Sequence, residues 1–172
     1  MITKDLNPSE YNAFYKRYID NVPEHLNLIE ALDDGLNQVS RFFKAIPQDK
    51  LNYIYAAGKW SIKEVFQHII DTERVFIYRC FRIARHDGTA LVGFEQDDYI
   101  IPSNAKNKSI ESLIEEYIAV RMYSLSVLKS LSEIDLEFIG IANGSKLSAR
   151  SAAFIIAGHE ITHVNVIKER YL

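Results

Sequence analysis

The sequence predicts an all-α protein, a four-helix bundle that forms a single domain over residues 1–172. Four long segments repeat apolar residues at spacings of three and four, which is the pattern of helices with one buried face. Only 7 glycines and 4 prolines occur, so the chain has few of the turns that many short strands need. With 172 residues, of which 48% are hydrophobic and 25% charged, the chain fits one hydrophobic core.

The first two predicted helices are delimited by a proline and by a capping motif. The first helix covers about 23–46, and Pro47 ends it. In the second, Ser61 and Glu64 form a capping box, in which each side chain accepts a hydrogen bond from the other residue's backbone N–H. The apolar stripe that follows stops at Gly88, so this helix is roughly 39 Å long.

Residues 88–108 have no helical period and predict a long connection. The third helix covers about 109–131 and the fourth about 148–170. Between them, Asn143–Gly144 is a turn signal, either the tip of a small hairpin or a loop. A connection of about 20 residues can return along the bundle, so we expect a crossover between helices two and three rather than a plain up-down-up-down order.

Charge and hydropathy exclude several classes of function. The formal net charge is -3, so nothing favours nucleic acid or an anionic membrane surface as a partner. No segment approaches the roughly 18 consecutive apolar residues of a membrane span, and the first residues lack the apolar core of a signal peptide. The single cysteine, Cys80, excludes an intramolecular disulfide and a multi-cysteine metal site. We therefore expect a cytoplasmic protein.

Three of the five histidines lie on or beside predicted apolar faces. At about 100° per residue, His159 and His163 fall within about 20° of the centre of the stripe on the fourth helix. His68 flanks the core face of the second helix. Neutral imidazoles side by side on an apolar face need polar partners that the stripe does not offer. A divalent metal ion would bind them, and the alternative is that each is a core histidine hydrogen-bonded to a neighbour.

Two acidic residues near these histidines are candidates for supporting roles. His159 to His163 matches the His-Glu-x-x-His pattern of zinc proteases. That function is excluded, because such proteases take a third ligand downstream and no histidine follows His163. Glu160 is therefore only a weak candidate for a base. Asp71, one helical turn from His68, could orient an imidazole, act as a base or reach the ion.

The histidine-bearing runs resemble those of the DinB/YfiT-like family. Residues 58–74 resemble the second helix of these proteins, residues 158–163 resemble their fourth, and the match extends over nearly the whole chain. The resemblance implies a four-helix bundle, often dimeric, in which His68, His159 and His163 hold Zn²⁺, Ni²⁺ or a similar ion. Family members include transferases that use bacillithiol or a related low-molecular-weight thiol, mycothiol-dependent isomerases, and proteins described only as metal-dependent hydrolases.

We accordingly expect an enzyme that acts on a small-molecule substrate. Three histidines leave a divalent ion its full charge and an open position, where a thiol or a water would be activated for transfer or hydrolysis. Thiol transfer is narrowly preferred, zinc is the first choice of metal and nickel the second. The alternative is a non-catalytic metal-binding module of a stress response, and no catalytic residue beyond the ligands is assigned.

The sequence also suggests a homodimer built on helix faces. Apolar groups near Phe42 on the first helix, and Ile114, Ile118 and Met122 on the third, exceed what one core needs.

Overall fold

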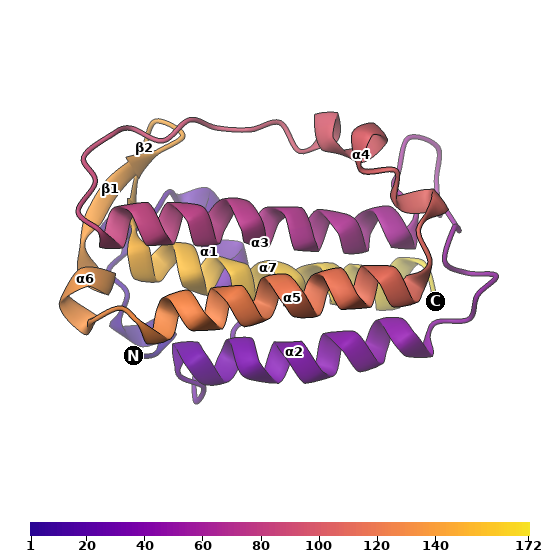
Figure 1. Cartoon of the computed structure of the whole chain (residues 1–172), viewed down its shortest axis with the longest axis horizontal. Helices are drawn as coiled ribbons and strands as arrows, with labels where there is room; N and C mark the ends of the chain where they lie inside the picture. The colour runs from indigo at the N-terminus through magenta and orange to yellow at the C-terminus, as the bar shows by residue number, and fades with distance from the viewer.

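The computed structural model describes residues 1–172 and confirms a four-helix bundle (Figure 1). The four long helices are α2 (Leu28–Ala45), α3 (Ile62–Ala84), α5 (Ile110–Lys129) and α7 (Ala149–Arg170). Helix α3 packs against α7 and α5, and α2 packs against the same two helices, so α2 and α3 occupy opposite corners of the bundle. None of these helices combines the length and the apolar character that crossing a membrane requires.

The chain returns along the length of the bundle between α3 and α5, which confirms the expected crossover. In Figure 1, α3 and α5 run in one direction, α2 and α7 run in the other, and the connecting segment passes over the outside of the bundle. This connection contains the short helix α4 (Asp97–Ser103) and a 3₁₀ turn, η4 (Ala105–Asn107), which the sequence analysis did not assign. Helices of this length are too short to show a clear apolar period.

The first long helix begins later than predicted, at Leu28 rather than near Pro23. Asn27 is its N-cap: the side-chain oxygen accepts hydrogen bonds from the N–H groups of Ile29 and Glu30, and Glu30 accepts one from the Asn27 N–H. This capping box decides where the helix starts, because it satisfies N–H groups that have no partner within the helix.

The residues before α2 form a cap of short helices that the sequence analysis left unassigned. Helix α1 packs against α7. These elements are η1 (Thr3–Asp5), η2 (Pro8–Glu10), η3 (Ala13–Tyr15) and α1 (Lys16–Ile19). They cover one side of the bundle and, as shown below, contribute to the surroundings of the histidines.

The turn signal at Asn143–Gly144 is the tip of a small hairpin. After helix α6 (Glu133–Glu137), strands β1 (Ile139–Ala142) and β2 (Ser145–Ser148) pair antiparallel, with Ala142 opposite Ser145. Asn143 and Gly144 both have positive φ, 50° and 72°, as the tight two-residue turn of a hairpin requires. Ser148 then caps α7, accepting a hydrogen bond from the Ser151 N–H.

The hydrophobic core divides into two clusters, one towards each end of the bundle. One contains Phe76 of α3 and Leu125 of α5, and the other contains Ile70 of α3 and Tyr117 of α5. Between them, near mid-height, each of the three helices α3, α5 and α7 contributes buried charged or imidazole side chains. The candidate functional residues lie in this polar layer.

Candidate metal centre

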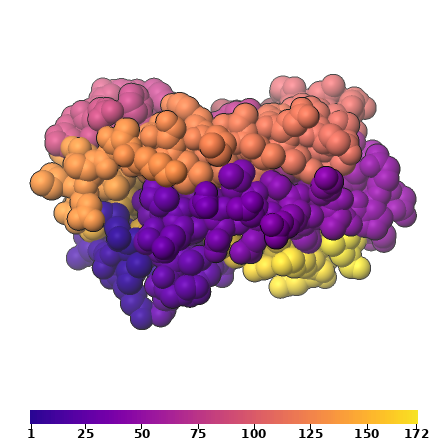
Figure 2. All heavy atoms as spheres, turned by 60° about the horizontal axis from the view of Figure 1, so that its bottom comes forward, coloured from indigo at the N-terminus to yellow at the C-terminus, as the bar shows by residue number.

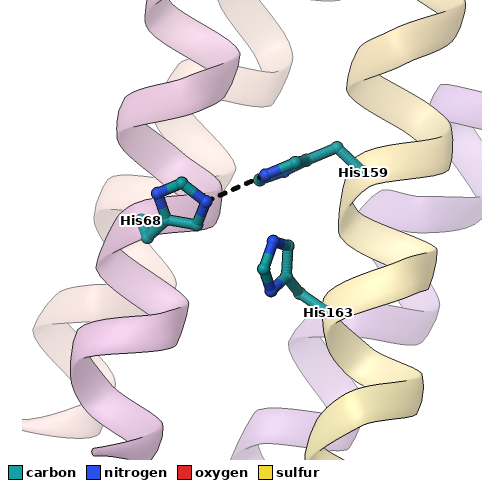
Figure 3. A group of neighbouring side chains, drawn as sticks. All are labelled: His68, His159 and His163. Atoms are coloured by element: carbon teal, nitrogen blue, oxygen red, sulfur yellow. Dashed lines mark hydrogen bonds between the residues drawn. The ribbon is translucent and has the colours of Figure 1, made fainter. Parts of the chain in front are cut away.

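Three histidines from two helices converge in the polar layer. His68 projects from α3, His159 and His163 project from successive turns of α7, and the three rings point into the space between the helices (Figure 3). One ring nitrogen from each lies within 4.8 Å of the others, and the Nε2 atoms of His68 and His159 are 2.9 Å apart. The structure thus brings together the three residues that the sequence singled out.

Burial keeps these imidazoles neutral. His68 and His159 are about 95% buried and His163 is half-buried. Burial lowers the pKa of His68 to about 3, with a smaller effect from the neighbouring His163, and lowers the pKa of His163 to about 4, with a smaller effect from the positive charge of Arg17. Burial also lowers the pKa of His159, to which both neighbouring histidines and Arg17 add. Near neutral pH each ring therefore has one nitrogen lone pair, and a ligand would replace the hydrogen bond that now joins His68 to His159.

Aromatic and hydroxyl groups surround the three rings. The indole of Trp60 lies beside His68, with ring centroids 4.8 Å apart, and Tyr18 of α1 meets His159 edge-on at 5.2 Å. Thr72, one turn along α3, places its Oγ1 atom 3.5 Å from Nδ1 of His68. The cap of short helices therefore covers part of the site, which the sequence analysis did not foresee.

Neither acidic candidate contacts the histidines. Asp71 accepts hydrogen bonds from Gln67 and Arg74, at 3.1 and 2.8 Å, in a surface network, and makes no hydrogen bond to His68. The side chain next to His68 Nδ1 is instead Thr72, because a residue four positions along a helix lies nearly in line, whereas one three positions along is rotated to the other side.

Glu160 belongs to a buried ion cluster that the sequence analysis missed. Its carboxylate accepts hydrogen bonds from Arg121 Nη2 at 2.6 Å and from the Tyr117 hydroxyl at 2.9 Å. Arg121 also binds Glu73 and donates to the carbonyl oxygen of Leu32 on α2. Although burial opposes the charge of Arg121, Glu160 and Glu73 raise its pKa well above the usual range. Glu160 is committed to this cluster and is not positioned as a base.

The sequence of the third predicted helix, α5, contains a pattern that indicates a buried arginine. Leu113, Tyr117 and Arg121 follow one another at intervals of four, and all three are fully buried. An arginine in the middle of an apolar stripe needs carboxylate partners. The spacing alone does not say which carboxylates, because they come from other helices.

The donor set of the three histidines fits a divalent metal ion. Three imidazole nitrogens about 2.0–2.1 Å from a tetrahedral ion lie about 3.3 Å from each other, and the observed spacing brackets that value. No carboxylate or thiol joins the group. Three protein ligands are one fewer than a closed tetrahedral site needs, so an ion held here would have a position open to a further ligand.

The chain matches the model of a known protein family. A model of the DinB superfamily matches residues 31–167, which contain all three histidines. The chain belongs to the DinB superfamily. A protein of Oceanobacillus iheyensis named "Putative metal-dependent hydrolase" is 27% identical over 153 residues, covering 87% of this chain and 85% of the relative. A protein of Bacillus mycoides with the same description is 24% identical over 166 residues, which cover 89% of this chain and 91% of that relative.

Solved structures share the fold of this DinB-superfamily chain. YfiT from Bacillus subtilis, described as "a probable metal-dependent hydrolase with an unusual four-helix bundle topology", superposes with a TM-score of 0.72 at 13% identity, over 83% of this chain and 85% of YfiT. A mycothiol-dependent maleylpyruvate isomerase superposes with a TM-score of 0.65 at 11% identity, over 96% of this chain and 62% of the isomerase. At these identities the likeness concerns the fold.

Proposed function

We propose that this chain is a metal-dependent enzyme in which His68, His159 and His163 hold one divalent ion. The observation that carries the proposal is the convergence of three neutral imidazoles, without a carboxylate or thiol, at one buried point. The metal-dependent names of its relatives support it. Imidazole donors suit Zn²⁺ first and Ni²⁺ second.

The chemistry follows from the neutrality of the ligands. A divalent ion bound there would lower the pKa of a water or thiol ligand towards neutrality or below. Because none of the three histidines carries a negative charge, they leave the charge of the ion uncompensated. Trp60 and Tyr18 pack beside the buried rings of His68 and His159.

Hydrolysis is the first reaction that we propose, since the relatives are named for it. Transfer of a low-molecular-weight thiol is the second, and the shared fold of a mycothiol-dependent isomerase supports it. Such a thiol would have to come from outside, because burial raises the pKa of Cys80, the single cysteine, to about 12 and keeps it a thiol. In both reactions the substrate is a small molecule.

Metal content and turnover test the proposal together. We expect close to one divalent ion per chain by elemental analysis in the wild type, and turnover of a panel of esters and amides, or of thiols with electrophiles, by the metal-loaded protein. His163→Ala should lose most of the ion and the turnover, whereas His25→Ala, which removes an exposed histidine outside the site, should keep both. Full metal retention in His163→Ala would refute the three-histidine site. Metal retention without turnover in the wild type would favour the non-catalytic metal-binding module.

Cobalt substitution tests whether the coordination is open. Azide or a small thiol should change the visible spectrum of the cobalt protein, because a site with three protein ligands has room for another. A spectrum that ignores every added ligand, in a protein that unfolds when chelated, would indicate a structural ion.

A further inference from the structure

A cavity of about 260 Å³ adjoins the histidine site. It lies between the η3–α1 segment, one face of α3 and residues 94–96 of the long connection, and His159 forms part of its lining. Its walls are largely aromatic. They include Phe14, Tyr15, Tyr18, Phe76 and Phe94. A pocket of this size and composition suits a small organic molecule with an apolar body.

Arg79 lines this cavity and is buried without a counter-ion. The residue is 3% exposed, its Nη2 donates a hydrogen bond to the carbonyl oxygen of Val92 at 3.0 Å, and the hydroxyl of Tyr15 is its other polar neighbour. Its guanidinium carbon lies 5.0 Å from the ring centroid of Phe76 and 5.7 Å from that of Phe94. No carboxylate lies within ion-pair distance, whereas the other fully enclosed arginine, Arg121, binds two.

An unpaired buried guanidinium lowers stability unless something else compensates it. A guanidinium has five N–H donors, and the bond to Val92 uses one of them. Proteins pair buried charges or use them, because removing a charge from water is costly. No enclosed side-chain nitrogen lacks a hydrogen-bond partner, so the remaining donors of Arg79 reach accessible space and are available to an anionic group that enters the cavity.

The rest of the lining is also electropositive. Arg17 stands at the rim, its guanidinium 4.0 Å above the ring of Phe14, and donates to the Tyr18 hydroxyl rather than to a carboxylate. The one acidic residue of the lining, Glu95, is exposed and accepts a hydrogen bond from the Asp97 N–H. The charged residues of the lining are therefore two arginines and one exposed glutamate. A divalent ion on the histidines would add further positive charge.

The residues of α3 that line the cavity extend from Thr72, one turn after His68, to Arg79. Thr72, Phe76 and Arg79 follow His68 on one face of the helix, and all three line the cavity together with His159. The Cα atoms of His68 and Arg79 are separated by a helical rise of about 16 Å. Side chains on a helix lean towards its N-terminus, which brings the guanidinium of Arg79 back over Phe76 and closer to the histidines.

We propose that this cavity binds a small carboxylate with an aromatic or other apolar body, whose carboxylate pairs with Arg79 while its other end faces His159. The planar fork of a guanidinium matches the two oxygens of a carboxylate. The aromatic walls supply contacts for the body of the ligand. This inference rests on the proposed function in one respect: it identifies the class of substrate that would reach the metal-bearing side of the cavity.

Binding of 3-phenylpropionate and of its uncharged amide tests the inference by calorimetry. We expect the acid to bind the zinc-loaded wild type about 10- to 100-fold more tightly than the amide, since a charge-assisted hydrogen bond is lost in the amide. Arg79→Met should remove this preference, and Arg79→Lys should keep part of it. Arg41→Met, which removes an exposed arginine of α2, should bind the acid as the wild type does.

Thermal unfolding provides a second measurement, which separates a binding role of Arg79 from a structural one. If Arg79 serves a ligand, the free Arg79→Met protein should melt at the same or a higher temperature than the wild type, and the acid should raise the melting temperature of the wild type but not of the variant. A lower melting temperature with unchanged acid binding would overturn the inference. Should Arg79→Met fail to fold, the acid–amide difference in the wild type and its reduction in Arg79→Lys decide the question.

Failure of this inference can be told from failure of the proposed function. The comparison of acid and amide is repeated on metal-free protein, where the guanidinium alone should still favour the acid. Equal binding of acid and amide in both forms, in a protein that binds metal and turns over substrate, would refute the role of Arg79 alone. Loss of metal binding with the acid preference intact would refute the metal centre alone.

Discussion

The backbone of Tyr18 lies directly against Gly158: a Cβ atom added to this glycine would approach the carbonyl oxygen of Tyr18 to 1.9 Å. Gly158 precedes the metal-site residue His159, and Tyr18 covers the ring of that histidine. The absence of one side chain therefore allows α1 to close over α7 beside the site. No carbon atom of a side chain could occupy this position without moving the backbone of α1.

Gly158→Ala is accordingly expected to destabilise the protein by about 1–3 kcal/mol, because the added methyl group overpacks the contact between α1 and α7. Urea unfolding followed by circular dichroism measures the loss. Gly88→Ala is the matched control, since a Cβ at Gly88 meets nothing within 4 Å, and its effect should stay within about 0.5 kcal/mol. Equal stabilities for the two variants would contradict the close packing of α1.

The buried ion cluster predicts a large effect of Arg121→Met. Removing the guanidinium leaves Glu73 and Glu160 buried without their cation, so we expect a loss of about 3–5 kcal/mol in the free energy of unfolding. Arg41→Met, on the exposed surface of α2, should change it little. If Glu160 acts only in this cluster, Glu160→Gln should lower stability but leave the metal content of the folded protein unchanged. A loss of metal in a folded Glu160→Gln protein would contradict our placement of this residue.

Thr72 and Asp71 should differ in their influence on metal binding. Thr72→Val removes the hydroxyl beside Nδ1 of His68 and is expected to weaken metal affinity by about tenfold, at the low end of what groups supporting a ligand contribute. Asp71→Asn alters a surface network with Arg74 and Gln67 and should leave the affinity unchanged. Competition with a chelator of known affinity measures both variants. The opposite ranking would restore Asp71 as the supporting residue.

Stability of the metal-free protein should fall as the pH drops below about 6.5. An unfolded histidine takes up a proton near that pH, whereas burial holds the pKa of His68 at about 3 and that of His163 at about 4 in the folded chain. Below 6.5 the unfolded state therefore binds more protons, and the free energy of unfolding decreases by up to about 1.4 kcal/mol per pH unit for each such histidine.

Urea titrations of the metal-free protein between about pH 7 and pH 5.5 measure this slope, in a range where most ordinary carboxylates stay ionised. His163→Asn should show a shallower slope, because one of the buried imidazoles is gone. Identical slopes for this variant and the wild type would show that His163 titrates alike in the folded and unfolded states.

Self-association is predicted through the outer face of α5. Ile118, Met122 and Tyr123 are exposed there, the last two by more than half of their surface, and Figure 2 shows α5 along the surface beside α2. We expect a dimer mass by light scattering at tens of micromolar, and a monomer for Met122→Glu, which places a charge in the apolar face. Ile134→Glu, at a still more exposed apolar residue of α6, should leave the dimer intact. A monomeric wild type would contradict the prediction.

Much of the bundle was readable from the sequence because the signals were local. The capping box of Ser61 and Glu64 fixed the start of α3, and the apolar periods located α5 and α7 to within a few residues. The first helix was placed too early, since Pro23 was favoured as its start over Asn27, whose cap lies within the same segment. The cap of 3₁₀ turns and α1 was not predicted, because segments of three or four residues have no period to detect.

For the site, the sequence by itself determined that His159 and His163 share a buried face of one helix, because their spacing of four nearly matches the helical repeat. It did not determine their surroundings. Only the tertiary structure decided that Thr72 rather than Asp71 lies beside His68, that Arg121 takes Glu160 away from the site, and that Arg79 faces the adjoining cavity without a carboxylate. These relationships join helices distant in sequence, and they depend on how the helices pack rather than on the period of any one of them.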